Sequence, residues 1–204
     1  GKVPRERVFL KKESWYDEQD IEWLPGLDVA ALDTKNAFVS LSDGRELPYD
    51  KLLIATGGEV QTVPEDVRGV SYLRTLDDAD HLLQLLGELP THAHAGIYGG
   101  GFIACEYLNL FANIGLPTTL AFRGPHFWSR VLDAESGALL NNHLLAHDVE
   151  LVSRAGFDGV TSQHQLEGFK TNHGTHPCAV LGIGVGIEPD LSWIRDAGIE
   201  VDAG

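Results

Sequence analysis

The pattern of apolar and polar positions predicts alternating strands and helices along most of the chain. Short β-rich runs at 28–33 and 37–44 predict two strands, and a continuous apolar run at 50–58 predicts a buried third strand. The Asp43-Gly44 pair is typical of a hairpin turn and lies between the second and third runs. Residues 58–69 are rich in turn formers and lack periodicity, as expected for a linker or a domain crossing.

A helix is predicted after the segment Thr75-Leu76-Asp77-Asp78, which has the composition of a helix cap. Apolar residues then recur at positions i, i+3, i+4 and i+7, so one face of this helix should be buried. That face consists of Ala79, Leu82, Leu83 and Leu86. Pro90 cannot continue the helix and is expected to end it.

A strand, a helix and a second strand follow within about 30 residues, which is the length of a βαβ unit. The strands are predicted at 95–99 and 118–122, with Gly115 and Pro117 stopping the helix between them. The predicted apolar face of that helix consists of Ile103, Tyr107, Leu110, Phe111 and Ile114. Because βαβ units build parallel sheets, the pattern predicts an α/β fold.

The remaining elements extend this α/β pattern. A third helix is predicted at about 134–147 and a strand at 149–153. Residues 156–186 are expected to form a β-meander that ends in the apolar run CAVLGIGVG at 178–186.

The stretch IYGGGFIACE at 97–106 contains the strongest indication of chemistry. Gly99, Gly101 and Ala104 have the spacing of a dinucleotide-binding loop between a strand and a helix. Gly99 would permit the tight turn, Gly101 would let the backbone approach a diphosphate, and Ala104 would let the helix lie close to the strand. The helix N-terminus would then offer free N–H groups to the anion. The alternative is a glycine turn without a ligand, but the strand and helix around the loop favour a dinucleotide site.

The choice of nucleotide depends on the end of the second strand. An NAD site usually has an acidic residue there, and residues 117–132 contain none. Arg123 and Arg130 lie in this segment instead, and arginine suits the 2′-phosphate of NADPH. NADPH is therefore favoured over NADH. The alternative for each arginine is a solvated surface residue, and it has more weight for Arg130 than for Arg123.

Composition excludes several other classes of protein. The chain has 204 residues, enough for one large domain or two small ones, and 43% of them are hydrophobic. Its net charge of -15, with only 15 basic residues, argues against nucleic acid as a partner. No apolar run reaches the length of a membrane span, so no membrane partner is expected. Cys105 and Cys178 form no CxxC pair, which favours a reduced, cytoplasmic setting.

No metal site and no catalytic side chain are predicted. His143 and His147 share a helix face but lack a third ligand nearby. His173, His176 and Cys178 lie where a hairpin enters a buried strand, and Cys105 is expected to have a packing role. Hydride transfer needs no dedicated catalytic residue, because the cofactors supply the chemistry.

Taken together, these stretches resemble the FAD-dependent pyridine nucleotide-disulfide oxidoreductases, and most of all the ferredoxin, rubredoxin and nitrite reductase flavoproteins. The segment from the glycine loop to TTLAFRG is also similar to the NADPH-binding part of glutathione reductases. The matching stretches are YDKLLIATGG, GVSYLRTLDDADHL, IYGGGFIACE, VLGIGVGIEPD and AGIEVDAG.

The resemblance implies two interleaved domains. Residues 1–74 would be part of a FAD-binding domain, 75–186 a Rossmann-like NAD(P)-binding domain inserted into it, and 187–204 the return to the FAD domain. The residues implied near FAD are Val29, Ala55, Thr56, Gly57 and Arg74. Those implied around the nicotinamide nucleotide are Gly99, Gly100, Gly101, Phe102, Ile103, Glu106, Arg123, Arg130, Gly182, Ile183 and Gly184, with Phe102 also near the flavin face.

The implied activity is hydride transfer from NAD(P)H to FAD, followed by electron transfer to an acceptor such as a ferredoxin or another redox protein. The first FAD diphosphate loop of the family and its later flavin-binding motif are not found in the sequence. The chain therefore resembles the middle of a longer flavoprotein, and alone it is expected to be inactive. Two alternatives stay open: a disulfide or persulfide reductase of the same superfamily, and a non-enzymatic module that responds to nucleotide.

Overall fold

The computed structural model describes residues 3–64, 67–162 and 164–202. The chain divides into two compact units. The smaller unit contains the residues up to Glu59 together with those from Ile187 onward, and the larger unit runs from Val60 to Gly186. Within the described residues, no helix is both long and apolar enough to cross a membrane.

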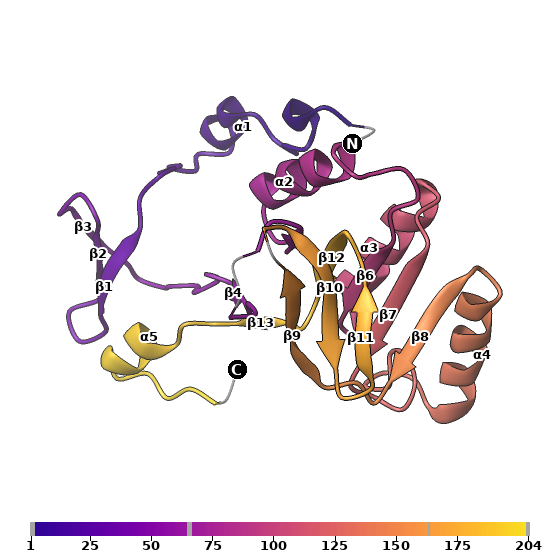
Figure 1. The fold of residues 1–204 in the computed structure, drawn as a ribbon. Helices are drawn as coiled ribbons and strands as arrows, with labels where there is room; N and C mark the ends of the chain where they lie inside the picture. Colours follow the sequence, from indigo (N-terminus) through magenta and orange to yellow (C-terminus); the bar gives the residue numbers. More distant parts are fainter. Residues whose placement is uncertain (1–2, 65–66, 163, 203–204) are drawn as a thin grey trace. The chain divides into compact units, whose positions relative to one another are not determined.

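A five-stranded sheet forms the centre of the larger unit (Figure 1). All neighbouring strands run parallel. Their order across the sheet is β5 (Val70–Ser71), β12 (Val180–Ile183), β6 (Ala95–Tyr98), β7 (Thr118–Phe122) and β8 (Val149–Ser153). Since parallel strands end at one common edge, the residues that follow β12, β6, β7 and β8 lie along the same rim of the unit.

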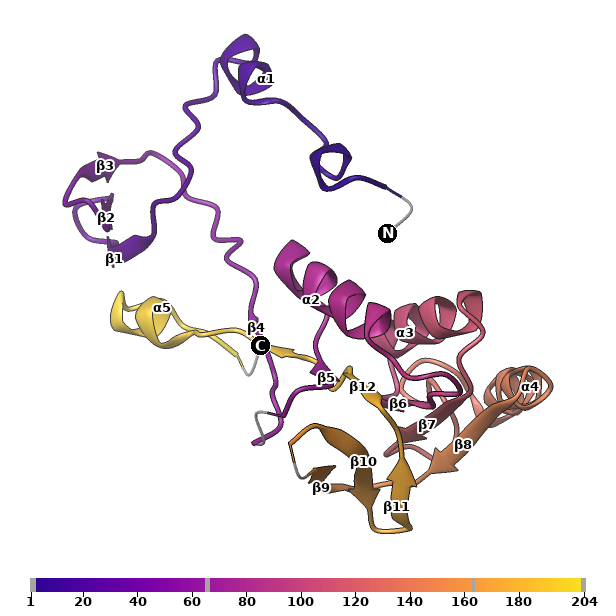
Figure 2. The same cartoon turned by 45° about the horizontal axis from the view of Figure 1, so that its top comes forward.

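Helices cover one face of this sheet and an antiparallel meander covers the other (Figure 2). The helices are α2 (Leu76–Gly87), α3 (Phe102–Asn113) and α4 (Ala134–Leu145). The meander consists of β9 (Phe157–Ser162), β10 (Leu166–Thr171) and β11 (Gly174–Pro177). With both faces covered, the central strands are apolar at almost every position, as expected for a parallel sheet.

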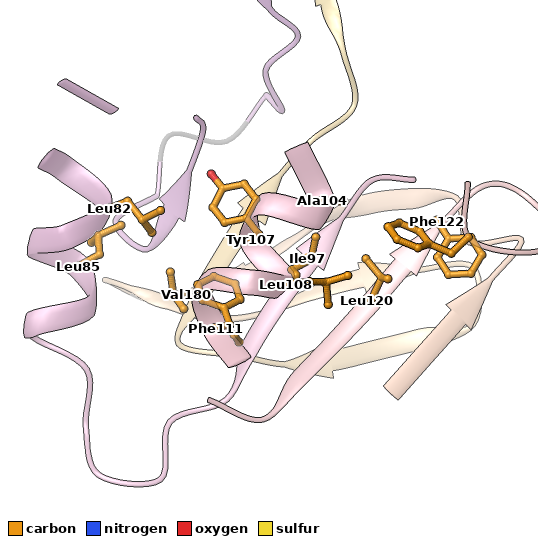
Figure 3. Packing of buried hydrophobic residues seen from close by; sticks show 12 residues of the cluster. Leu82, Leu85, Ile97, Ala104, Tyr107, Leu108, Phe111, Leu120, Phe122 and Val180 are labelled. Atoms are coloured by element: carbon orange, nitrogen blue, oxygen red, sulfur yellow. The ribbon is translucent and has the colours of Figure 1, made fainter. Parts of the chain in front are cut away.

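Side chains of the central strands alternate between two hydrophobic clusters. Ile97 and Leu120 lie in the cluster beneath the helices, together with Tyr107 and Phe111 of α3 (Figure 3). Tyr98, Ala121 and Leu181 lie in the cluster beneath the meander, against Phe169. This alternation follows from the two-residue period of a strand. It determines that the last residue of β6 points to the meander side.

The smaller unit contains short elements. Its main regular structure is the antiparallel sheet of β1 (Val29–Asp33), β2 (Phe38–Leu41) and β3 (Glu46–Pro48). The Thr34 hydroxyl donates to the carbonyl of Ala197, the residue after α5 (Ser192–Asp196). β13 (Ile187–Glu188) forms a two-stranded sheet with β4 (Glu59–Val60), whose second residue is the first of the larger unit. The remaining elements of this unit are a 3-10 helix (Arg5–Arg7) and α1 (Glu13–Glu18).

The prediction of a buried strand at 50–58 is wrong. This segment has no strand, and the side chain of Leu53 is 88% exposed. The turn at Asp43-Gly44 does form, with Gly44 at a φ of 88°, but it joins β2 to β3 rather than to the apolar run. Residues 46–48 have taken the place expected for the third strand, because they can pair with β2.

Two further predictions need correction. On α2, Leu82 and Leu85 are buried whereas Leu83 is exposed, so the buried face is rotated from the predicted one toward the sheet. The run at 178–186 does not end the meander. Val180–Ile183 instead pairs in parallel with β5 and β6, because its continuous apolar character suits the centre of a sheet.

Other local predictions are confirmed. Strands form at Thr118–Phe122 and Val149–Ser153, and Thr75 caps α2 by a capping box with Asp78. The third helix ends at Leu145, two residues before the expected boundary. The α/β fold is therefore established, while the assignment of 1–74 and 187–204 to a FAD domain and of 75–186 to an NAD(P) domain stays a prediction.

Candidate functional site

The glycine loop lies between the end of β6 and the start of α3, at the carboxyl edge of the sheet. Gly101 is the N-cap of α3 and provides no side-chain cap, and the first turn contains no acidic residue. A Cβ atom added to Gly101 would meet nothing within 4 Å. The helix N-terminus is therefore open, and its partial positive charge is not neutralised locally. Both features suit an anion such as a diphosphate.

Gly99 has a steric role in addition to its place in the turn between β6 and α3. Its φ is 152°, and an added Cβ would overlap the carbonyl group of Gly184, whose carbon would lie 2.7 Å away. The Gly184 amide donates to the Tyr98 carbonyl at 2.9 Å. Gly99 is thus needed because the backbones that follow β6 and β12 touch each other there.

The segment Gly182-Ile183-Gly184, which consists of the end of β12 and the residue after it, lies directly beside the glycine loop. A Cβ atom added to Gly184 would lie 3.2 Å from the backbone nitrogen of Ala104 and from the Cβ of Ile103. A Cβ atom added to Gly182 would lie 2.6 Å from the ring of Tyr107. The Tyr107 hydroxyl donates to Ser71 at 3.1 Å, and burial raises the pKa of this phenol far above its usual value. The structure thus brings together two segments that are about 80 residues apart in sequence.

Arg123 follows β7 at the same edge of the sheet, and its side chain is exposed. Its Nε atom donates to the Tyr98 hydroxyl at 3.3 Å, and that hydroxyl donates to the Ala155 carbonyl at 3.2 Å. Arg130 is also exposed, in the segment between β7 and α4. Within the described part of the chain, no hydrogen bond joins Arg130 to the glycine loop, so it is the weaker candidate of the two.

An aromatic pair flanks the start of α3. Phe102 is 70% exposed, and the edge of its ring contacts Trp128 at a centroid distance of 4.6 Å. The indole nitrogen of Trp128 donates to the Cys105 sulfur at 3.1 Å. Burial raises the pKa of the Cys105 thiol, although the Trp128 hydrogen bond opposes this shift. Cys105 is therefore suited to packing rather than to reaction as a thiolate. Glu106, the next residue, is exposed.

The family model for the pyridine nucleotide-disulphide oxidoreductases matches residues 3–204. The chain belongs to this family. A curated relative, the ferredoxin–NAD(+) reductase subunit of the benzene 1,2-dioxygenase system of Pseudomonas putida, is 34% identical over 96% of this chain and 48% of its own length. Putidaredoxin reductase of Pseudomonas putida is 28% identical over 100% of this chain and 50% of its own length. The chain thus spans about half the length of these oxidoreductases.

Solved structures of this family have the same fold. The covalent complex of putidaredoxin reductase with putidaredoxin contains a chain that matches with a TM-score of 0.86 and 28% identity, over 100% of this chain and 51% of that chain. A ferredoxin reductase from Rhodopseudomonas palustris also matches with a TM-score of 0.86, at 23% identity, over 96% of this chain and 48% of that chain.

The positions that the family resemblance implied near FAD lie mostly in the smaller unit. Val29 begins β1 opposite Leu41. Ala55, Thr56 and Gly57 lie in the exposed segment after Leu53, with Gly57 at a φ of 71°. Arg74 belongs to the larger unit, where its amide donates to the Asp78 carboxylate that helps to cap α2. The roles of these residues in an oxidoreductase of this family remain predictions.

Three residues of the site region were missed from the sequence. They are Tyr98, Trp128 and Arg154, whose amide donates to the Gly124 carbonyl at 2.9 Å. A phenol directly before the glycine loop and an arginine directly after the strand at 149–153 were visible signals. Trp128 gave no such signal. Among the described residues, no group of three His, Cys, Asp or Glu side chains could hold a metal.

Proposed function

We propose that this chain is the nucleotide-binding part of an NAD(P)H-dependent FAD oxidoreductase. The whole protein passes hydride from the nicotinamide to FAD and then electrons to an acceptor, with a small redox protein such as a ferredoxin as the acceptor class. The observation that carries this proposal is the open N-terminus of α3 behind Gly101, in a chain that matches the family over residues 3–204.

The relatives support the acceptor class. They include reductases named for ferredoxin, rubredoxin and putidaredoxin, and each match covers nearly all of this chain. The cysteines of this chain give no support to a disulfide reductase. Cys178 is buried, and burial raises the pKa of the Cys105 thiol, which disfavours the reactive thiolate.

Different residues of the larger unit would bind different parts of the nucleotide. The amides at the start of α3 would hold the diphosphate, and Gly101 would leave room for it. The backbone at Gly182–Gly184 and the side chain of Glu106 would orient the nicotinamide end, and Phe102 with Trp128 would exclude water beside it. The bound nucleotide would supply the hydride.

The finer proposal is a preference for NADPH. Arg123 stands at the end of β7, where a 2′-phosphate would be recognised, and no acidic residue lies between Pro117 and Leu132 to accept from a ribose hydroxyl. Several relatives are named as NAD(+) reductases, so this preference would distinguish the present protein from them. A cytoplasmic setting is likewise proposed, from the cysteine pattern alone.

The first experiment tests the nucleotide site. Replacing Gly101 by Val should weaken NADPH binding to the 204-residue chain by more than about tenfold, because the side chain would occupy the space left for the diphosphate. Gly87→Val is the matched control. A Cβ atom there also meets nothing within 4 Å, but Gly87 is the last residue of α2 and is not part of the glycine loop. Calorimetry with NADPH measures both. Equal affinities for the two variants would show that the loop is only a turn.

The second experiment tests the reaction. The native protein that contains this chain is expected to purify with bound FAD and to reduce ferricyanide at the expense of NADPH. A colourless protein that binds NADPH without oxidising it would contradict the proposed oxidoreductase and would support a nucleotide-responsive module instead.

A further inference from the structure

We propose that Tyr98 is a positioning residue that sets the preference for NADPH by holding Arg123 in place. The inference rests on the proposed role of Arg123. It concerns a residue that is buried beneath the site and would touch no part of the nucleotide itself. The observation behind it is a chain of two hydrogen bonds, from Arg123 Nε to the Tyr98 hydroxyl and from that hydroxyl to the Ala155 carbonyl.

Tyr98 is held from every side. Its backbone lies in β6 between Ile183 of β12 and Ala121 of β7, and only 2% of the residue is exposed. Its ring contacts that of Phe157 at a centroid distance of 4.9 Å. The hydroxyl therefore has a fixed position, in contrast to a hydroxyl on an exposed side chain.

The two hydrogen bonds define one donor role and one acceptor role for this hydroxyl. A phenol has one proton to donate, and the Ala155 carbonyl receives it at 3.2 Å. The oxygen is then left as an acceptor, and Arg123 Nε approaches it at 3.3 Å. Only a donor fits in that position. Phenylalanine would fill the same volume but would offer Arg123 nothing.

This contact would prepare Arg123 for a phosphate. Arginine loses much rotational freedom when it binds a ligand, and a side chain that is already ordered loses less. The bond to Tyr98 uses Nε and leaves both terminal nitrogens, which can form a two-pronged interaction with a phosphate. Among the described residues, the Tyr98 hydroxyl is the one hydrogen-bond partner of the Arg123 side chain.

The location agrees with a 2′-phosphate rather than with another part of the nucleotide. Arg123 and the glycine loop both follow neighbouring parallel strands, whose register pairs Tyr98 with Ala121. In folds of this kind the end of the second strand faces the adenosine ribose. NADH lacks the 2′-phosphate, so a residue that acts only through Arg123 should leave NADH binding unchanged.

The test is a double-mutant cycle on the 204-residue chain, with NADPH and NADH titrated by calorimetry. Arg123→Ala should weaken NADPH binding by about ten- to a hundredfold, the loss expected for one charge-assisted contact. Tyr98→Phe should weaken it by roughly three- to tenfold. In the double variant the loss should be no greater than for Arg123→Ala alone, because Tyr98 would act only through Arg123. NADH affinity should stay within about twofold throughout.

Tyr72→Phe is the matched control, because its hydroxyl accepts from the Val63 amide at 2.9 Å in the same unit, a contact that does not involve Arg123. It should leave both affinities unchanged. Additive losses in the double variant, or equal losses of NADPH and NADH in Tyr98→Phe, would overturn the positioning role. An effect of Arg123→Ala without any effect of Tyr98→Phe would overturn it too, while leaving the NADPH proposal intact. If Arg123→Ala changed neither affinity, the NADPH proposal itself would fail and this inference with it.

Discussion

Two apolar runs of similar composition differ in burial in this molecule. The run at 52–57 reads LLIATG and the run at 180–184 reads VLGIG, and both end in glycine. In the first, Leu53 is 88% exposed, whereas Val180 and Leu181 in the second are completely buried. Hydrophobicity alone therefore does not distinguish a central strand from an exposed segment.

The two runs differ in burial because they have different neighbouring strands and side chains. β12 is paired on one side with β5 and on the other with β6, so its backbone groups are satisfied in both directions. Its faces are covered by Tyr107 of α3 and by Phe169 of the meander. Among the described residues, no strand pairs with 50–58. An apolar run thus specifies a need for burial, while its partners determine whether that need is met.

A charge placed in each run should give the largest contrast. Leu181→Asp would bury an unpaired carboxylate within the cluster beneath the meander and is expected to lower the free energy of unfolding by more than about 4 kcal/mol. Leu53→Asp should change it by less than about 0.5 kcal/mol. Urea unfolding followed by circular dichroism compares the two. A large loss in Leu53→Asp would mean that the run is buried in solution.

The reactivity of a thiol beside or within each run should also differ strongly. Burial raises the pKa of the Cys178 thiol, just before β12, from 9.0 to about 12, against the weaker effect of a hydrogen bond from Gly96. At pH 8 its thiolate should therefore be about a thousandfold scarcer than that of an ordinary cysteine. A cysteine introduced by Leu53→Cys should be alkylated by iodoacetamide at an ordinary rate, and that rate should rise with pH up to about 9.

The control for that measurement is the same chain in urea, where Cys178 and the introduced cysteine should react alike. Rapid alkylation of Cys178 in the folded chain would contradict the burial of the segment that leads into β12. Mass spectrometry of the alkylated peptides distinguishes these cysteines from Cys105.

Adding a single methyl group in β12 should give the smallest change in stability of the three predictions. Gly182→Ala would place a Cβ 2.6 Å from the ring of Tyr107, which is itself fully buried, and should cost about 1–3 kcal/mol of stability. Gly87→Ala is the same chemical change at a position with open space, and it should be neutral or slightly stabilising. Thermal unfolding measures both variants. If Gly182→Ala were also neutral, the contact between β12 and α3 would be looser than the structure indicates.

Sequence reasoning succeeded where local pattern is sufficient. The capping box at Thr75 and the strand at Thr118–Phe122 depend on neighbouring residues, and both are confirmed. It failed where a distant partner decides. Whether Leu83 or Leu85 is buried depends on where the sheet lies beneath α2, and the place of Val180–Ile183 depends on β5 and β6. Hydrophobic periodicity indicates neither the position of the sheet beneath a helix nor the pairing partners of a strand.

The candidate site shows the same division. The glycine loop could be located from spacing, because its chemistry is contained in a few consecutive residues. The contact of Gly99 with Gly184 and the bond from Arg123 to Tyr98 each join separate strands, so only the fold reveals them. The roles assigned to Glu106, Arg130 and the residues near Val29 and Ala55 remain predictions.

Trp128 gives the larger unit an optical property of its own. It is the single tryptophan between Val60 and Gly186, and its indole lies against Phe102 at the start of α3. Indole emission overlaps the absorption band of a reduced nicotinamide, so a nucleotide bound at this helix end would quench it by resonance energy transfer. With the other tryptophans of the chain, Trp15, Trp23 and Trp193, replaced by phenylalanine, the emission of Trp128 would report occupancy of the loop without a label.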